Sequence, residues 1–300
     1  MELKFDDGKI TFIVDTLCTI DFIHKGGSYA IHKLAFELAH SGHYVYVFNE
    51  PIYPHPNIQV IETTRTAHDN GWWGDFNWEP FSYNPSRTVS VYTQITWGNP
   101  FNAIHNTRWF LDNYEPEKWE SYKNDFIYNY GSFALPEGVG SKNLTVFDYN
   151  FENYYNQNNP NRKGFGYLFH KRTPDWGKDF VDKFGAQEIP HYNGKKDLRY
   201  LLDEFNKYEY VLTFDDKSYY TTAAALCGTK AIILNTDPNL TPNEYRHLNP
   251  IQMCGVAYGM NDIKWANETI GLVRDNLLEL EKKDKQTVNN FIEFWKNKLG

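Results

Sequence analysis

Four side chains that can bind a polar ligand stand close together late in the sequence. They are Asp215, Ser218, Tyr219 and Thr221. They follow an apolar run, residues 210–214, that predicts a strand, and they introduce a helical run, residues 219–227. In a parallel sheet such a junction lies at the carboxyl edge, where ligands bind, so we expect these side chains to face a ligand. The alternative is that Asp215 or Ser218 only caps the helix.

A second set of candidate residues is basic. Its members are Arg162, Lys163, His170, Lys171 and Arg172. The formal charge of −8 argues against a broad nucleic-acid surface, because affinity for a polyanion comes from clustered Lys and Arg. In an acidic chain this set instead indicates a site for one phosphorylated small molecule. There Lys171 and Arg172 can bind phosphate oxygens without a metal. The alternative is a solvated turn.

The first half of the chain supplies candidates for a general base and for an acceptor site. The candidates for the base are Asp15, Asp21 and His24. The candidates for the lining of the acceptor site are Gly26, Gly27, Tyr92, Gln94, Gly98 and Asn99. The alternatives are that the glycine pair serves a turn and that His24 is an ordinary surface residue. An aromatic insert, residues 71–85, is interpreted either as a wall on which a sugar stacks or as a loop that packs its own rings.

The elements that must position these residues alternate between strand and helix. Strands are expected at residues 9–15, 44–48, 58–61, 88–92, 124–130, 144–147, 164–169, 186–189, 210–214 and 230–234. Helices are expected at residues 28–43, 103–111, 175–184, 195–207, 219–227, 262–280 and 284–299. This alternation predicts an α/β fold with parallel sheets and helices on both faces.

Length and composition favour a folded protein of two domains. The chain has 300 residues, 41% of them hydrophobic, and an Asn-rich run at residues 150–161 predicts the domain boundary. The first ten residues lack the apolar stretch of a signal peptide, and no window approaches the ~20 apolar residues of a transmembrane segment. Three scattered cysteines suit a reducing compartment and match no metal spacing. We therefore expect a cytoplasmic protein without a metal site.

Three segments resemble motifs of known proteins. Residues 92–113 are similar to YPE-x-x-x-GNP-L-x-A-x-x-x-x-RW-x-L, a stretch found in a group of bacterial and viral glycosyltransferase-like proteins. Residues 214–228 resemble the YD-x-x-T-x-x-S-x-EAALCG element of that group, and residues 255–259 resemble its GIAYG turn. Together with the two α/β halves, these segments resemble the GT-B class of nucleotide-sugar glycosyltransferases.

The resemblance implies an architecture. It implies two Rossmann-like domains that face a cleft: residues 1–155 on the acceptor side and residues 156–285 binding the nucleotide sugar. Residues 286–300 would form a helix that crosses back onto the first domain. Its apolar face would carry Val288, Phe291, Ile292 and Trp295.

The resemblance also implies an activity. The expected reaction transfers a hexosyl or pentosyl group from a nucleotide-sugar donor to a glycan or other acceptor, without a cofactor or metal, and with retention by analogy. The sequence leaves the oligomeric state open.

Two positions depart from the resembled pattern. Gln94 stands where the group has Glu, and Ala223 stands where GT-B enzymes commonly place the Glu that binds the donor ribose. Nearby hydroxyl groups could replace the missing hydrogen bonds, and Ala223→Glu is expected to raise donor affinity. The departures favour an alternative, a carbohydrate-binding or scaffold protein that kept the fold and lost turnover. A further alternative is a transferase acting on modified bases of viral DNA.

Overall fold

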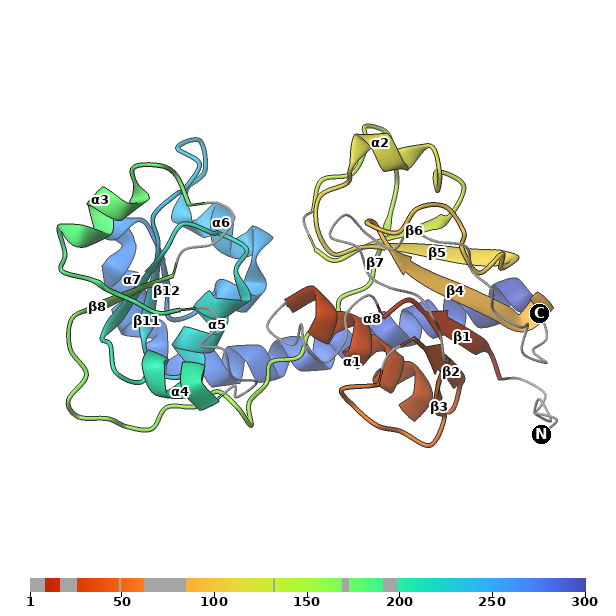
Figure 1. The fold of residues 1–300 in the computed structure, drawn as a ribbon, viewed down its shortest axis with the longest axis horizontal. Helices are drawn as coiled ribbons and strands as arrows, with labels where there is room; N and C mark the ends of the chain where they lie inside the picture. Colours follow the sequence, from red (N-terminus) through yellow and green to blue (C-terminus); the bar gives the residue numbers. More distant parts are fainter. Residues whose placement is uncertain are drawn as a thin grey trace. The chain divides into compact units, whose positions relative to one another are not determined.

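The chain forms two compact α/β units in a computed structural model (Figure 1). The structure describes residues 9–16, 26–48, 50–61, 85–131, 133–168, 173–190 and 199–300. Unit 1 comprises residues 1–148 and 283–300, and unit 2 comprises residues 149–282. The chain thus passes from unit 1 to unit 2 after residue 148 and returns to unit 1 after residue 282. The boundaries expected from the sequence are residues 155 and 285.

Unit 1 contains a seven-stranded parallel sheet in the order β3-β2-β1-β4-β5-β6-β7. Its strands are β1 (Thr11–Val14), β2 (Tyr44–Val47), β3 (Ile58–Val60), β4 (Thr88–Thr93), β5 (His105–Phe110), β6 (Phe126–Asn129) and β7 (Lys142–Asn143). The order along the sheet reverses between β1 and β4. Such a reversal is a topological switch point, and the carboxyl ends of its two strands are the usual place for a ligand.

Helices pack on one face of this sheet around the main core of unit 1. They are α1 (Gly26–His40) and the last part of α8 (Val273–Leu299). The predicted apolar face of the last helix is buried in this core, which contains Val288, Phe291, Ile292 and Trp295. A separate cluster contains Tyr92 and Phe101, and the described part of the unit also includes the short helix α2 (Pro116–Trp119). The final helix is therefore part of the core of unit 1.

Unit 2 contains a five-stranded parallel sheet in the order β12-β11-β10-β8-β9. Its strands are β8 (Phe165–Leu168), β9 (Gln187–Glu188), β10 (Tyr210–Thr213), β11 (Lys230–Ile233) and β12 (Val256–Tyr258). Its helices are α3 (Gly177–Asp182), α4 (Arg199–Phe205), α5 (Tyr219–Leu226), α6 (Pro242–Leu248), α7 (Ile263–Thr269) and the first part of α8. If the five strands of unit 2 are numbered 1 to 5 along the chain, their order in the sheet is 5-4-3-1-2. This is a common doubly wound arrangement, and its switch point lies between β8 and β10.

One predicted helix is a strand. Residues 105–110 of the segment predicted as a helix form β5, which pairs in parallel with β4 on one side and β6 on the other. The spacing of Ala103 and Leu111 suggests a helix, but Thr107, Trp109 and Phe110 are buried on alternate faces of a central strand. Tertiary pairing thus overrides the local pattern.

Three other predicted elements differ in extent. The strand expected at residues 144–147 is wrong, because β7 covers only Lys142–Asn143. The break between the two closing helices was expected at residues 281–283, but it lies at residues 270–272. α7 ends at Thr269, and α8 runs without a break from Val273 to Leu299, a stretch that contains no Gly or Pro. The expected turn at residues 255–259 is strand β12 between two glycines of positive φ. Among the described residues, no helix has the length and apolar character needed to cross a membrane.

Candidate functional site

The two donor-side segments predicted from the sequence both leave from the switch point of unit 2. β8 ends at Leu168, which is paired with Thr213 at the end of β10. The chain that follows β8 contains Lys171 and Arg172, which lie outside the described residues. The chain that follows β10 contains Asp215 and leads into α5. The candidate residues therefore follow neighbouring strand ends at the edge where doubly wound sheets bind ligands.

Asp215 organises the loop after β10. The residue is 4% exposed, and its Oδ1 accepts a hydrogen bond from the amide of Lys217 at 3.2 Å. Its own amide donates to Thr213 Oγ1 at 3.3 Å. We expected this carboxylate to lie nearer to solvent. Its bond to the amide two residues on is instead that of an Asx turn, which fixes the path of the loop toward the helix.

Ser218 is the N-cap of α5, as the capping alternative predicts. It has extended backbone angles, and its Oγ accepts a hydrogen bond from the amide of Tyr220 at 3.2 Å. Tyr219 begins the helix, and its ring packs edge to face against that of Tyr154 with centroids 5.9 Å apart. Both residues are buried, so their observed contacts are internal to unit 2.

Thr221 is engaged inside the protein. Its hydroxyl donates to the carbonyl of Ser218 at 2.7 Å and accepts from Gln252 Nε2 at 2.7 Å. The Gln252 side chain in turn accepts from the hydroxyl of Tyr258 at 2.7 Å. Thr221 thus positions a buried network between α5 and β12 and has no exposed surface of its own. Nothing in the sequence pairs Thr221 with Gln252, which is 31 residues away.

Ala223 is fully buried in α5. A Glu side chain at this position would place a carboxylate and extra volume inside the packed unit, which is destabilising. This burial argues against the expectation that Ala223→Glu raises donor affinity, which stays a prediction. Any ligand hydroxyl near α5 has to be bound by other groups.

Asp216 is an acidic residue near the site that the sequence reasoning passed over. It is half-buried, and its charge acts on two tyrosines from neighbouring elements, Tyr245 and Tyr258. Burial is the main cause that raises the pKa of each phenol, and the negative charge of Asp216 raises it further. The two rings stack at 4.5 Å, so an aromatic pair from α6 and the end of β12 lies near an acid.

One member of the predicted basic set, Arg162, serves the fold. Arg162 and Lys163 precede β8, whereas residues 170–172 follow it in the sequence and lie outside the described residues. The Arg162 guanidinium donates to Thr229 Oγ1 at 2.6 Å and to Asn156 Oδ1 at 2.9 Å, and also bonds the carbonyl of Cys227. Arg162 therefore holds the end of α5 and is not a candidate for phosphate binding.

In unit 1, Asp15 lies at the switch point between β1 and β4. It directly follows β1, is 1% exposed, and accepts a hydrogen bond from Thr96 Oγ1 at 2.8 Å. Asp21 and His24, the other base candidates, lie outside the described residues. The aromatic insert at residues 71–85 also falls outside them, except for its last residue. Asp15 therefore links the loop after β4 to the end of β1.

The predicted glycine pair opens α1. Gly26 and Gly27 are the first two residues of the helix. A Cβ atom built at Gly27 would meet only Leu111 Cδ1, at 3.9 Å, which is an ordinary contact. Space alone therefore does not require a glycine at position 27.

The motif at residues 92–113 holds together the crossover from β4 to β5. The Tyr92 hydroxyl donates to Asn99 Oδ1 at 2.7 Å, and Asn99 also bonds both backbone groups of Ala103. Gly98 has a positive φ of 56°, and its amide donates to Ser121 Oγ at 3.0 Å. Gln94 Oε1 accepts from the amide of Leu111 at 3.0 Å. The contacts of these predicted acceptor residues are thus internal to unit 1.

Arg108 is the centre of this crossover. Its guanidinium donates to the carbonyls of Thr93, Thr96 and Gly98 at 3.0, 2.6 and 2.6 Å, and to Asp125 Oδ2 at 3.0 and 2.7 Å. It lies between the rings of Tyr92 and Tyr122, 4.8 and 4.4 Å from their centroids. Trp109, the next motif residue, donates to the carbonyl of Leu144 at 2.8 Å. The motif is therefore built chiefly to shape the loop at the unit 1 switch point.

Within the described ranges, no group of three or more His, Cys, Asp and Glu side chains is placed to hold a metal ion.

Comparisons with known proteins find only distant structural similarity. No protein-family model matches this sequence, and no curated protein is significantly similar to it. Similar solved structures include MurG of Acinetobacter baumannii, at 10% identity over 96% of this chain and 99% of that chain, with a TM-score of 0.38. They also include CalG4, the calicheamicin glycosyltransferase (8% identity, 96% and 98% covered, TM-score 0.40). SnogD, a glycosyltransferase from Streptomyces nogalater, is similar at 11% identity (95% and 98% covered, TM-score 0.41). TM-scores below 0.5 decide neither fold nor activity, so neither is taken from these proteins.

Proposed function

We propose that this chain is a glycosyltransferase that binds a nucleotide-sugar donor on unit 2 and an acceptor on unit 1. One observation carries the proposal. The acid, the basic pair and the helix start that the sequence assigns to a donor site follow β8 and β10, the two strands at the switch point of a doubly wound sheet. That position is where sheets of this order bind nucleotides.

The proposed roles follow from the chemistry of each group. Lys171 and Arg172 stabilise the diphosphate as it leaves, together with the amides at the start of α5. Asp215 fixes the loop, so that the half-buried Asp216 and the backbone after β10 are the groups that meet sugar or ribose hydroxyls. The proposal includes transfer of a hexosyl or pentosyl group to a glycan or other acceptor, with retention and without a metal or cofactor.

The acceptor side is proposed at the switch point of unit 1. Asp15 lies there, and its bond to Thr96 ties it to the loop after β4. Of the base candidates, Asp15 is buried and already hydrogen-bonded, so we assign it to positioning, and we retain Asp21 and His24 as candidates for the base itself.

The test is calorimetric titration with a panel of nucleotide sugars and with the matching nucleoside diphosphates. Lys171→Ala with Arg172→Ala should weaken diphosphate binding at least tenfold, the effect expected for charge-assisted hydrogen bonds. Asp216→Asn should weaken binding several-fold with an unchanged thermal melt, since the change removes the charge that meets the ligand hydroxyls and leaves the turn at Asp215 intact. Asp179→Asn, an exposed change on α3, is the matched control and should bind as the parent does. Equal affinities in all variants would place the donor site elsewhere.

A second candidate function is carbohydrate binding without turnover. It is favoured by Ala223, which is buried where the resembled enzymes carry a Glu, and by the internal contacts of Ser218 and Thr221. Donor hydrolysis separates the two. A protein that binds nucleotide sugars but releases no free sugar over hours would support the second candidate, whereas hydrolysis that Lys171→Ala abolishes would support the first.

A further inference from the structure

An exposed indole lies at the carboxyl edge of the unit 2 sheet. Trp176 directly precedes α3 and is 49% exposed. Its ring contacts that of Phe214, the residue that follows β10, with centroids 5.3 Å apart. This contact places Trp176 beside the carboxyl end of β10, next to the switch point between β8 and β10. A single exposed apolar side chain is ordinary on a protein surface, and what distinguishes Trp176 is the way it is held.

The backbone around Trp176 is fixed. The amide of Gly177 donates to the carbonyl of Pro174 at 2.8 Å, and the amide of Phe180 donates to the carbonyl of Trp176 at 3.1 Å. The chain also passes very close to Phe214, because a Cβ atom built at Gly177 would lie 3.1 Å from Phe214 Cζ. A glycine therefore allows the chain to bring Trp176 down onto this ring.

The ring of Trp176 rests on an ordered base. Its contacts with Phe214 and Phe180 are both close to perpendicular, at interplanar angles of 78° and 72°. Phe214 is 1% exposed and belongs to the core of unit 2. About half of Trp176 nevertheless remains accessible. An aromatic ring that is already ordered can stack on a ligand with little further loss of side-chain entropy.

The chain leaves the two strands at the switch point in opposite directions. β8 leads through α3 to β9, on its side away from β10, whereas β10 leads through α5 to β11, on its side away from β8. Right-handed crossovers therefore place α3 and α5 on opposite faces of the sheet. The crevice between the starts of two such helices is where doubly wound proteins bind ligands. Trp176 lies on the α3 side of this crevice.

Charge indicates which part of a ligand can lie against this ring. The exposed neighbours Asp175 and Asp179 are acidic, and Lys178 is paired with Asp182. Phosphate groups are repelled from such a place. A nucleobase is uncharged and flat, so it can cover a whole face of an indole, and the stacking of bases on aromatic side chains is a strong contact. The alternative, a sugar ring, offers the indole only its apolar face.

We propose that Trp176 is the platform on which the base of a bound nucleotide stacks, with the phosphates directed away from the acidic start of α3. That this nucleotide carries a sugar for transfer rests on the proposed function. Stacking makes a base necessary for tight binding. Because every base has a π face, it does not select one base, so the platform accepts both purine and pyrimidine nucleotides.

The experiment is an NMR titration of the full chain, followed through the indole N–H signals of tryptophan. The Trp176 signal is the one that is lost in Trp176→Phe. The probes are UMP and GMP, and ribose 5-phosphate is the match that lacks a base. The ring current of a stacked base should move the Trp176 signal with both nucleotides and not with ribose 5-phosphate. Both nucleotides should also bind at least about fivefold more tightly than ribose 5-phosphate.

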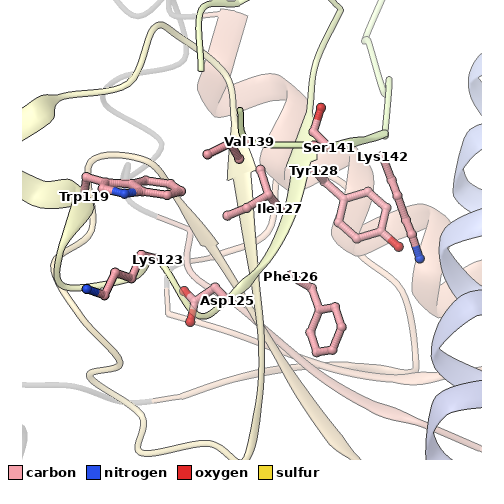
Figure 2. A pocket seen from close by; sticks show the side chains of 10 residues that line it. Trp119, Lys123, Asp125, Phe126, Ile127, Tyr128, Val139, Ser141 and Lys142 are labelled. Carbon is pink, nitrogen blue, oxygen red and sulfur yellow. The ribbon is translucent and has the colours of Figure 1, made fainter. Parts of the chain in front are cut away.

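Two variants and a control test the contact. Trp176→Leu keeps an apolar cover over Phe214, and it should remove most of the difference in affinity between UMP and ribose 5-phosphate. Trp176→Phe keeps a π face and should retain part of that difference. The control is Trp119→Leu, the same change at an indole that lines a pocket of about 510 Å3 in unit 1, and it should leave both affinities unchanged (Figure 2). Thermal melts check each variant, and the signal shift in the parent protein decides if Trp176→Leu unfolds.

Several outcomes would overturn the proposal. Nucleotides that bind no more tightly than ribose 5-phosphate, or that bind without moving the Trp176 signal, would leave Trp176 as a cover for Phe214. A signal that moves equally with ribose 5-phosphate would assign the ring to a sugar. Weaker UMP binding in Trp119→Leu, with no change in Trp176→Leu, would move the base to unit 1.

Failure of the proposed function is a separate result. A chain whose Trp176 stacks on UMP but that hydrolyses no nucleotide sugar would keep this inference and lose the proposed function. Donor hydrolysis that is equally fast in Trp176→Leu, measured at a donor concentration well below saturation, would keep the proposed function and overturn this inference.

Discussion

The buried guanidinium of Arg108 allows a sharp test of how the crossover from β4 to β5 is held. Arg108→Met keeps the length and apolar volume of the side chain between Tyr92 and Tyr122 but removes every hydrogen bond. The carbonyls of Thr96 and Gly98 and the carboxylate of Asp125 then lose this donor inside unit 1, whereas the carbonyl of Thr93 keeps the amide of Thr96. Breaking a buried ion pair from one side costs about 3–5 kcal/mol, and each orphaned carbonyl adds about 1–3 kcal/mol before relaxation. We therefore expect a loss of at least about 4 kcal/mol.

The pKa shifts of Arg108 and Asp125 indicate that part of this loss of stability depends on the charge of Asp125. Burial outweighs the ion pair for both partners, because the pKa of Arg108 is lowered and that of Asp125 is raised even though each faces the other. Without Arg108 the folded-state pKa of Asp125 rises further above its unfolded value. The charge part of the destabilisation is then present at high pH and is relieved as the pH falls and Asp125 takes up a proton. Arg108→Met should accordingly be less damaging at pH 5 than at pH 8.

The assay is native-state hydrogen exchange of the amides of β4 and β5. It reports the free energy of opening unit 1 without requiring that both units unfold together. The control is Arg87→Met, which removes a single bond at 3.3 Å from a partly exposed side chain and should cost less than about 1 kcal/mol. If Arg108→Met costs no more than the control, or if its cost is the same at both pH values, the assignment of Arg108 as the centre of the crossover is refuted.

Three further predictions concern stability. Removing residues 286–300 deletes the buried Phe291 and its neighbours on α8, so calorimetry should show unit 1 unfolded or melting far lower, whereas unaltered melting would mean that the helix is a free tail. Burial lowers the pKa of His43 to about 4, below its unfolded value of 6.5. About 3 kcal/mol of unfolding free energy that is present above pH 6.5 should therefore be lost as the pH falls toward 4. In urea titrations, His43→Gln should reduce the dependence of the unfolding free energy on pH. Gly228→Ala forces a Cβ atom onto a φ of 82° and within 2.7 Å of Asn156, and should cost at least about 1 kcal/mol by urea unfolding; no loss would mean that the helix end adjusts freely.

The sequence predicts those elements whose local pattern and tertiary role agree. The apolar run of β1, the helical spacing of α1 and the junction of β10 with α5 are of this kind, and the serine that caps α5 is recognisable from its type and place alone. β5 is not predictable in this way. Its segment carries His105, Asn106 and Arg108, and an arginine inside a central strand is stable only because loop carbonyls and Asp125 surround it.

The candidate site shows the same division. The position of Asp215 after a strand follows from local pattern, but its nearly complete burial does not. Arg162 looks like a phosphate ligand in the sequence because its partners, Thr229 and Cys227, are more than 60 residues away. A basic or hydroxyl side chain that serves the fold is distinguished from one that serves a ligand only by where the chain brings its distant partners.

The division of unit 1 between the two ends of the chain has a consequence for biosynthesis. Its core needs Phe291 and Trp295, which are made only after all of unit 2. At about 5–20 residues per second, on the order of 10 s pass between synthesis of residue 148 and of residue 283. During that interval unit 2 is being synthesised, while the sheet of unit 1 waits with the apolar surface that α8 will cover still exposed. Nascent unit 1 is therefore the part of this protein that we expect chaperones to bind, until synthesis of α8 supplies the helix that covers this surface.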